Sequence, residues 1–505
     1  MNRTKSIKNL VYGLVSFAVT TLLGIVIPRL VLVSYGSETN GLLNSVRQIF
    51  AYFALLEAGV GAAALQALYG PVGRGEREEV CAILAAAQRF FRRTGVLYAL
   101  GVGLLALVYP LLVRTQLPGY LVVGVILFQG LSSVVKYFTT ASVQLLLRVD
   151  GKNYVLGNIS MVFTVLSNVA RIWLMSRGFG VLWVQGAFCL VDLCQAALVA
   201  GYARRHYPWL TFRAKPNEQA VAQRGDVLVH QLSALVFNNT DTILITGFCG
   251  LKLVSVYGMY AMLYGMVASM VTLVSSSLNF ALGQLFHRDR ERYRQVQGVY
   301  ETYYLALSFA LFYVAFLFIR PFLALYTAGV EDISYQDHWL PGLFLLMQLL
   351  NYGRNPSNNS IDYAGHYRQT KWRSVLESAI NLVVSLVCIP ALGIYGAVLG
   401  TIAALFYRTN DIIVYAHRVV LGDSPWLTYR RWLRNGVVLA VLLWAGRLLP
   451  RQYSGYVPLI ATAALTTVVV LAAFAGVNTL LEPEARRAAW AYFREWKGRP
   501  KRKNG

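Results

Sequence analysis

Acidic side chains are scarce in this chain of 505 residues. It contains 23 Asp and Glu against 46 Lys and Arg, which gives a formal net charge of +23. Only five cysteines and six histidines occur, and they form neither a CxxC pair nor a Cys/His cluster. This distribution argues against a disulfide framework and against a metal site. No cofactor and no catalytic residue are predicted from the sequence.

Charged residues of either sign are few, and apolar residues are abundant. Charged residues make up 14% of the chain, whereas 56% of it is hydrophobic. No basic soluble domain is available to bind nucleic acid, so the positive charge does not indicate a nucleic-acid partner. This composition is typical of a polytopic membrane protein.

The apolar residues gather in segments long enough to cross a bilayer as helices, which takes about 20 residues each. The fold class predicted is an all-α polytopic membrane protein with about fourteen transmembrane helices. Their expected positions are 10–33, 42–68, 92–113, 119–146, 154–175, 180–202, 226–248, 253–284, 297–320, 340–366, 374–391, 394–416, 434–450 and 455–481.

Basic residues outside these segments occur mainly in every second connection. The basic stretches are 1–9, 74–93, 148–152, 203–225, 288–294, 368–373, 408–434 and 482–503, and the connections between them, such as 34–40 and 327–339, carry few or none. Cytoplasmic connections are enriched in Lys and Arg. We therefore expect a multi-pass protein of the inner (plasma) membrane with both termini cytoplasmic, whose basic surface attracts anionic lipids.

Short motifs recur in the same order in two parts of the chain. Leu-Pro-Gly occurs at 117–119 and again at 340–342, and a Gly-rich start precedes both 180–202 and 394–416. This weak repeat predicts duplicated bundles with a substrate site between them. The predicted domains are two six-helix bundles at 1–202 and 226–417, a cytoplasmic linker at 203–225, a loop with two added helices at 418–481, and a basic tail at 482–505.

Five basic residues fall well inside predicted spans, where a charge costs roughly 2.5–3.5 kcal/mol and so needs a cavity or a partner. Polar residues line one helical face around some of them, notably Gln129, Ser133 and Thr140 in span 119–146. Pro356 interrupts the corresponding span 340–366. The candidate substrate-binding residues are Arg47, Lys136, Arg354, Arg29 and Arg171.

The same side chains have a structural interpretation. Polar residues between helices can hold the helices together, and the acids within spans can neutralise the cations as salt bridges. Those acids are Glu57, Asp192, Asp241 and Asp362. Glu57, Asp241 and Asp362 are also candidates for coupling transport to a proton or a sodium ion.

Several stretches resemble the polysaccharide-export flippases of the multidrug/oligosaccharidyl-lipid/polysaccharide exporter superfamily. They include Ile-Pro-Arg-Leu-Val-Leu-Val-Ser-Tyr-Gly-Ser-Glu-Thr-Asn-Gly-Leu (27–42), Leu-Leu-Glu-Ala-Gly-Val-Gly (55–61), the basic connection 74–93, Leu-Arg-Val-Asp-Gly-Lys (147–152) and Gly-Ile-Tyr-Gly-Ala (393–397). The resemblance extends over the whole chain, including the plan of twelve spans plus two.

This resemblance implies a flippase that moves undecaprenyl-diphosphate-linked oligosaccharide across the membrane by alternating access, for cell-surface polysaccharide biosynthesis. It implies a basic central cavity for the diphosphate, where Arg47, Lys136 and Arg354 match by location. Polysaccharide polymerase machinery is a candidate partner.

Other functions are also considered. A lipid II flippase or a multidrug exporter belongs to the same superfamily, although the drug-exporting branch typically uses acidic cavity residues. A membrane polysaccharide polymerase or glycosyltransferase is the alternative from another class. Such enzymes usually present an outer catalytic loop or domain, and the longest outer connection here, 327–339, is too short to fold alone. The chain is therefore predicted not to be an enzyme.

Overall fold

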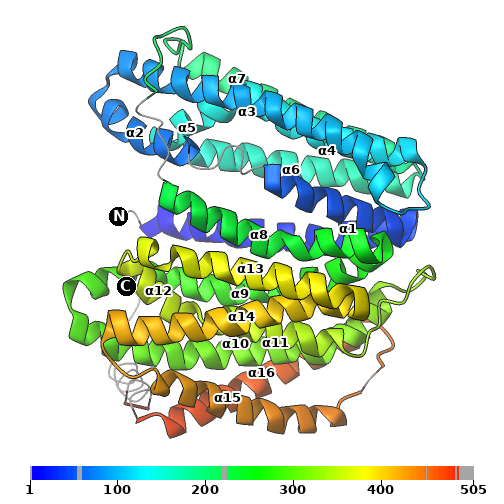
Figure 1. Cartoon of the computed structure of the whole chain (residues 1–505), viewed down its shortest axis with the longest axis vertical. Helices are drawn as coiled ribbons and strands as arrows, with labels where there is room; N and C mark the ends of the chain where they lie inside the picture. Colours follow the sequence, from blue (N-terminus) through cyan, green and yellow to red (C-terminus); the bar gives the residue numbers. More distant parts are fainter. Residues whose placement is uncertain (1–2, 54–59, 219–224, 451, 484–485, 488–505) are drawn as a thin grey trace, which may run out of the picture. The chain divides into compact units, whose positions relative to one another are not determined.

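The computed structural model describes residues 3–53, 60–218, 225–450, 452–483 and 486–487 (Figure 1). All secondary-structure elements in these ranges are helices, which confirms the predicted fold class. They are α1 (Arg3–Phe53), α2 (Val60–Arg74), α3 (Arg77–Leu112), α4 (Gly119–Thr139), α5 (Ala141–Val149), α6 (Asn153–Ser176), α7 (Val181–His206), α8 (Gly225–Cys249), α9 (Leu251–Arg288), α10 (Arg290–Tyr326), α11 (Leu340–Gly353), α12 (Asn355–Tyr363), α13 (Tyr367–Leu392), α14 (Ile394–Tyr415), η3 (Ala416–Leu421), α15 (Trp426–Ala445), η4 (Gly446–Leu448) and α16 (Tyr456–Leu481).

The described part of each predicted span falls almost entirely on one helix or on two consecutive helices. Among the described residues, ten helices are long and apolar enough to cross a membrane. A helix needs about 20 residues to cross the hydrocarbon core, and helices of this kind recur from α1 to α16. The chain is a multi-pass membrane protein.

Packing divides the chain into two compact units. Unit 1 comprises Met1–Val256 and Gly329–Ile333, and unit 2 comprises Tyr257–Ala328 and Ser334–Gly505. In unit 1, α4 packs against α3 and α7; in unit 2, α13 packs against α14 and α10 against α16. The predicted domains rest on an internal repeat of the sequence, which is a different property from packing, and they stay a prediction.

Apolar side chains fill the interior of each unit. In unit 1, Leu84, Val122 and Val125 are fully buried within one hydrophobic cluster. In unit 2, the ring of Phe344 stacks on that of Tyr264, whose hydroxyl donates to the Pro341 carbonyl at 2.7 Å. The hydroxyl needs this acceptor, because a buried polar group without a hydrogen bond is destabilising.

The expected outer connection 34–40 is wrong in its extent. The α1 helix runs through this stretch, and only Gly36, at φ 80° and ψ 172°, departs from helical geometry. Such a φ is readily adopted by glycine, which has no Cβ. Asp332 supports the break, since its carboxylate accepts from the Ser37 backbone N–H at 2.9 Å and from the Ser37 hydroxyl at 2.6 Å. A single glycine and an N-cap from a distant loop thus replace the predicted connection.

Two predicted spans are each built from two helices. Span 119–146 divides at Thr140, between α4 and α5, so its polar face is not one continuous helix. Span 340–366 divides at Arg354, between α11 and α12, and Pro356 lies in the first turn of α12. The predicted interruption at Pro356 is therefore confirmed. Proline is accepted there because the first N–H groups of a helix have no partner within it.

The first part of the predicted linker 203–225 packs on unit 1. Tyr207 and Trp209 join its hydrophobic cluster, and the Asn217 N–H donates to the Ala82 carbonyl at 3.2 Å. The Tyr207 hydroxyl donates to Asp150 at 2.5 Å. Burial, together with this carboxylate, raises the pKa of Tyr207 to about 12. Residues 219–224 lie outside the described part of the chain.

Candidate functional site

Unit 1 contains a cavity of about 430 Å³ between α1, α4, α6 and α7. The part of α1 after Gly36 supplies Asn44 and Arg47, and the part before it supplies Pro28. Gln129 comes from α4, and Arg171 from α6. Because α1 bends at Gly36, one helix lines the cavity along two separate segments.

The two guanidinium groups of the lining are Arg47 and Arg171. Arg47 is accessible and opens on the cavity. Arg171 stacks over the Phe188 ring of α7 with 3.8 Å between its Cζ and the ring centroid. Its buried Nε has no hydrogen-bond partner in the described structure. Cation–π stacking holds the guanidinium plane while leaving its in-plane donors available.

Lys136 is not free to act as an isolated cation. Its Nζ lies 3.3 Å from Oδ2 of Asp192, a lining residue on α7. Asp192 is thus one of the acids within spans that neutralises a cation, as the structural interpretation predicted. The Lys136 side chain is partly accessible, at 42%.

The charges around the cavity do not cancel. Its described lining contains two guanidiniums and one carboxylate, and Lys136 already pairs with that carboxylate. Arg47 and Arg171 also lie close enough to repel each other. Two positive charges therefore remain in the cavity lining, and both would attract an anion placed there.

The remaining candidates lie elsewhere. Arg29 is half-buried on α1, next to the lining residues Ile27 and Pro28. Asp241 is buried on α8, and Asp362 is exposed on α12, where it accepts from Asn358 at 3.0 Å. Glu57 lies outside the described residues.

Arg354 belongs to unit 2 and to a network of five charged side chains. Its Nη1 lies 2.6 Å from Oε1 of Glu377 on α13, and Arg408 of α14 contacts the other oxygen of Glu377 at 3.4 Å. Asp411 joins Arg408 to Arg373. The predicted convergence of Arg354 with Arg47 and Lys136 on one cavity stays a prediction.

Arg408 corrects one expectation from the charge pattern. The pattern places it in the basic connection 408–434, but it lies within α14 and is 6% exposed. The physical reason is its pairing with Glu377 and Asp411, which offsets the cost of burying the charge. The sequence signal that could have located it is Asp411, three residues later on the same helix face.

Solved structures of membrane transporters share this fold. The structure of "Lipid II flippase MurJ, inward closed conformation" matches with a TM-score of 0.65 and 11% identity, and covers 92% of this chain and 97% of that one. An inward-facing multidrug resistance MATE family transporter of the MOP superfamily matches with a TM-score of 0.58 and 13% identity, over 80% of this chain and 94% of that one. The chain has the fold of the MOP exporter superfamily.

A third match agrees with this fold assignment. A structure of the MATE multidrug transporter DinF-BH has a TM-score of 0.55 at 16% identity, over 80% of this chain and 93% of that one. No protein-family model and no curated protein sequence matches the chain. The superfamily resemblance predicted from sequence motifs is confirmed at the level of the fold.

The described residues provide no metal centre. No group of three or more His, Cys, Asp or Glu side chains within them could hold a metal ion. Around the unit 1 cavity, Asp192 is paired with Lys136, Arg171 stacks on Phe188, and Arg47 is accessible, so the chemistry that this arrangement supports is the binding of an anion.

Proposed function

We propose that this chain is a flippase that moves undecaprenyl-diphosphate-linked oligosaccharide from the cytoplasmic to the outer leaflet for cell-surface polysaccharide biosynthesis. The observation that carries the proposal is the uncompensated positive charge of Arg47 and Arg171 in the unit 1 cavity. A diphosphate is a multiply charged anion, and guanidinium groups bind phosphate oxygens through paired hydrogen bonds. The fold shared with membrane transporters supports the transport role.

A second feature supports a lipid substrate. An apolar pocket of about 970 Å³ lies in unit 2, lined by α9, α10 and α16. The lining includes several leucines and tyrosines, among them Leu278, Leu282, Leu307, Leu471 and Tyr303. Such a pocket suits a long hydrocarbon chain, whose burial contributes roughly 0.8 kcal/mol per CH₂ group. In the proposed function this pocket takes up the prenyl tail.

The charge balance also bears on the alternatives. A cationic drug would meet Arg47 and Arg171 as like charges, because Asp192 is already paired with Lys136. An anionic lipid headgroup of another kind, including a peptidoglycan precursor, fits the same charges. These lipids share the charged phosphate group and differ in the part attached to it. A role as a polymerase or glycosyltransferase has no supporting group in the cavity described above.

The proposal can be tested with variants in which the cavity arginines are replaced by neutral residues. Two properties are measured: binding of a prenyl diphosphate and complementation of a flippase-deficient strain. We expect Arg47→Gln and Arg171→Gln each to weaken binding of a prenyl-diphosphate analogue about 10–100-fold, since a hydrogen bond to a charged group is worth about 1.5–3 kcal/mol. Both variants should fail to complement a flippase-deficient strain at normal membrane levels. Arg47→Lys should retain part of the binding, because the charge persists and the paired donors are lost.

Matched controls are the exposed cations Arg114 and Arg177, which lie in connections of the same unit. Arg114→Gln and Arg177→Gln should bind and complement like the unaltered protein. Normal binding by the double variant Arg47→Gln, Arg171→Gln would refute the anion site. Normal binding of the analogue without transport of any tested lipid-linked oligosaccharide would instead refute the substrate.

A further inference from the structure

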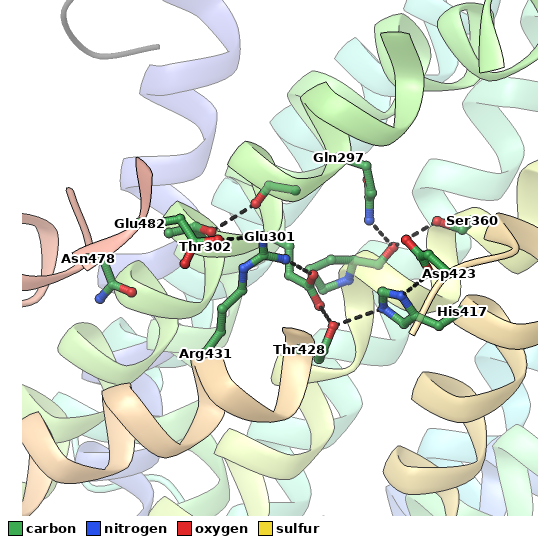
Figure 2. Close-up of polar contacts among 12 residues, drawn as sticks. Gln297, Glu301, Thr302, Ser360, His417, Asp423, Thr428, Arg431, Asn478 and Glu482 are labelled. Atoms are coloured by element: carbon green, nitrogen blue, oxygen red, sulfur yellow. Dashed lines mark hydrogen bonds and ion pairs between the residues drawn. The ribbon is translucent and has the colours of Figure 1, made fainter. Parts of the chain in front are cut away.

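A chain of polar contacts in unit 2 takes no part in the cavity or in the apolar pocket (Figure 2). It joins Glu301 of α10 to Thr428 and Arg431 of α15, and extends to His417 in η3 and to Glu482 at the end of α16. All five side chains are buried, at 5% exposure or less. The η3 segment is a π-helix, a rare conformation that often marks functional sites.

Three of these groups and the neighbouring Asp423 form a continuous row from the surface to the interior. Asp423, whose side chain is 42% exposed, lies 2.6 Å from Nδ1 of His417. Nε2 of His417 lies 2.9 Å from the Thr428 hydroxyl, and this hydroxyl lies 2.8 Å from Oε1 of Glu301. Glu301 is buried beside Arg431, with 2.6 Å between Oε2 and Nη1.

The row needs one more proton than its ordinary charge states supply. Three hydrogen bonds link Asp423, His417, Thr428 and Glu301, so three hydrogens are required. The Thr428 hydroxyl provides one, and a neutral imidazole provides one. With both carboxylates ionised, the third hydrogen is present only if His417 is an imidazolium, with both ring nitrogens donating.

The charges of the surrounding side chains also indicate one added proton. Arg431 and Arg434 are positive, whereas Glu301, Glu482 and Asp423 are negative, so one added proton makes the group neutral. Burial alone would raise the pKa of Glu482, but hydrogen bonds from Arg434 and Arg431 hold it below its usual range, and Glu482 stays ionised.

The other neighbours add no further acid or base to the row. From α10, Tyr293 and Tyr300 lie near Glu301. Arg294 of α10 approaches Gly422 beside η3, but its side chain is 45% exposed and its charge is already matched by Glu291 at 3.8 Å. Arg418 of η3 itself is exposed to solvent. The helices α12 and α14 pack against η3 through Ile361, Ile412 and Tyr415. A neutral tyrosine or an isoleucine neither supplies nor removes the third hydrogen near neutral pH.

We propose that His417 and Glu301, connected by the Thr428 hydroxyl, form a binding site for a single proton that enters past Asp423. The proton rests on His417 while Arg431 pairs with Glu301. To move inward, the Nε2–H proton passes to the Thr428 oxygen as the Thr428 hydroxyl proton passes to Oε1 of Glu301. One N–H bond is broken and one O–H bond is formed, and Thr428 ends with one hydrogen as it began.

Proton transfer changes how the last two helices are held. Arg431 is shared between Glu301 of α10 and Glu482 at the end of α16. When Glu301 becomes neutral it loses its attraction for Arg431, and α15 with α16 is held to α10 by fewer ion pairs. This inference does not depend on which molecule the protein transports.

The experiment is nitrogen NMR of the full chain labelled with ¹⁵N-histidine, titrated over about pH 5 to 8, where histidines change charge. His417→Gln identifies the signal of His417 among the six histidines. In the unaltered protein we expect both nitrogens of His417 to be protonated at the acid end and one proton to leave in a single step. Glu301→Gln should lower the proton affinity at least tenfold, a shift of about one pH unit, because the amide N–H supplies the missing hydrogen.

Three further variants sharpen this test. Thr428→Val should abolish the effect of Glu301→Gln on His417, whereas Thr428→Ser should retain it. Asp423→Asn, at the exposed end of the row, should also lower the proton affinity of His417 and does not alter the buried ion pairs. His366, which contacts Tyr415 instead, is the internal control and should titrate identically in all variants. A His417 that stays neutral down to about pH 5, or that titrates identically with Glu301→Gln, would overturn the proposal.

Discussion

The Lys136 ammonium lies 3.3 Å from the Asp192 carboxylate, and this ion pair joins α4 to α7 beside the unit 1 cavity. It removes the only negative charge found in the described lining. Lys136 therefore contributes to the positive potential of the cavity by neutralising Asp192, and Arg47 and Arg171 remain available to an anion.

The role of this pair can be tested by neutralising each charge in turn. Lys136→Gln should greatly reduce transport, because the Asp192 carboxylate is then unpaired and offsets the charge of one of the two arginines. Adding Asp192→Asn should restore transport to within a few-fold of the unaltered protein. Complementation of a flippase-deficient strain, normalised to membrane levels, measures both. A double variant as inactive as Lys136→Gln alone would show that the ammonium itself contacts the substrate.

The network around Glu377 predicts a loss of stability. Glu377 pairs with Arg354 and Arg408, which are both largely buried. Glu377→Gln should lower the free energy of unfolding by about 3 kcal/mol, since two buried cations lose a partner. Thermal unfolding of the purified protein measures the loss. Glu331→Gln, at an exposed position, is the control and should leave the melting temperature unchanged; equal melting of the two variants would contradict the role of the network.

The break in α1 can be tested at both of its supports. Asp332→Ala removes the acceptor of the Ser37 N–H and should cost about 1 kcal/mol, the usual value of an N-cap. Gly36→Ala should cost about 1–3 kcal/mol, because φ 80° with ψ 172° is a backbone conformation that essentially only glycine adopts. Unfolding measurements on both variants, with Glu331→Ala as the neighbouring control, check these values. If Gly36→Ala is as stable as the unaltered protein, the break is not a property of the folded state.

The membrane orientation predicted from the basic connections can be tested by cysteine labelling in intact cells. In a variant without native cysteines, Lys215→Cys should be protected from an impermeant reagent, and Ser334→Cys should be modified. Both positions are exposed, so burial does not account for protection. Modification of Lys215→Cys from outside would reverse the assignment of the two sides.

Much of the fold was predictable because span length follows from bilayer thickness. The segments 92–113 and 455–481 each lie on one helix, and Pro356 marks a real interruption. The partners of Lys136 and Arg354 were less predictable, because an ion pair between helices depends on how each helix is rotated about its axis. Asp192 was one of several acids within spans, and neither Glu377 nor the burial of Arg408 was recognised.

The break at Gly36 and the hydrogen-bonded row at His417 could not be predicted from the hydrophobic periodicity of the sequence either. A one-residue departure from helix geometry leaves the hydrophobic pattern almost unchanged, and its support comes from Asp332, far along the chain. The row from Asp423 to Glu301 joins residues that are far apart in the sequence. Its protonation state depends on which atoms carry hydrogens. Sequence spacing contains no information about that.

The sharing of Arg431 between Glu301 and Glu482 also constrains the order in which the protein is made. Arg431 is synthesised 130 residues after Glu301, and Glu482 follows 51 residues after Arg431. At about 5–20 residues per second, roughly 10–40 s pass between the first carboxylate and the last. During that time Glu301 waits in the membrane without its cation, and Arg431 then waits without its second anion. The three ionised groups that join α10, α15 and the end of α16 can therefore all be paired only after translation has passed Glu482.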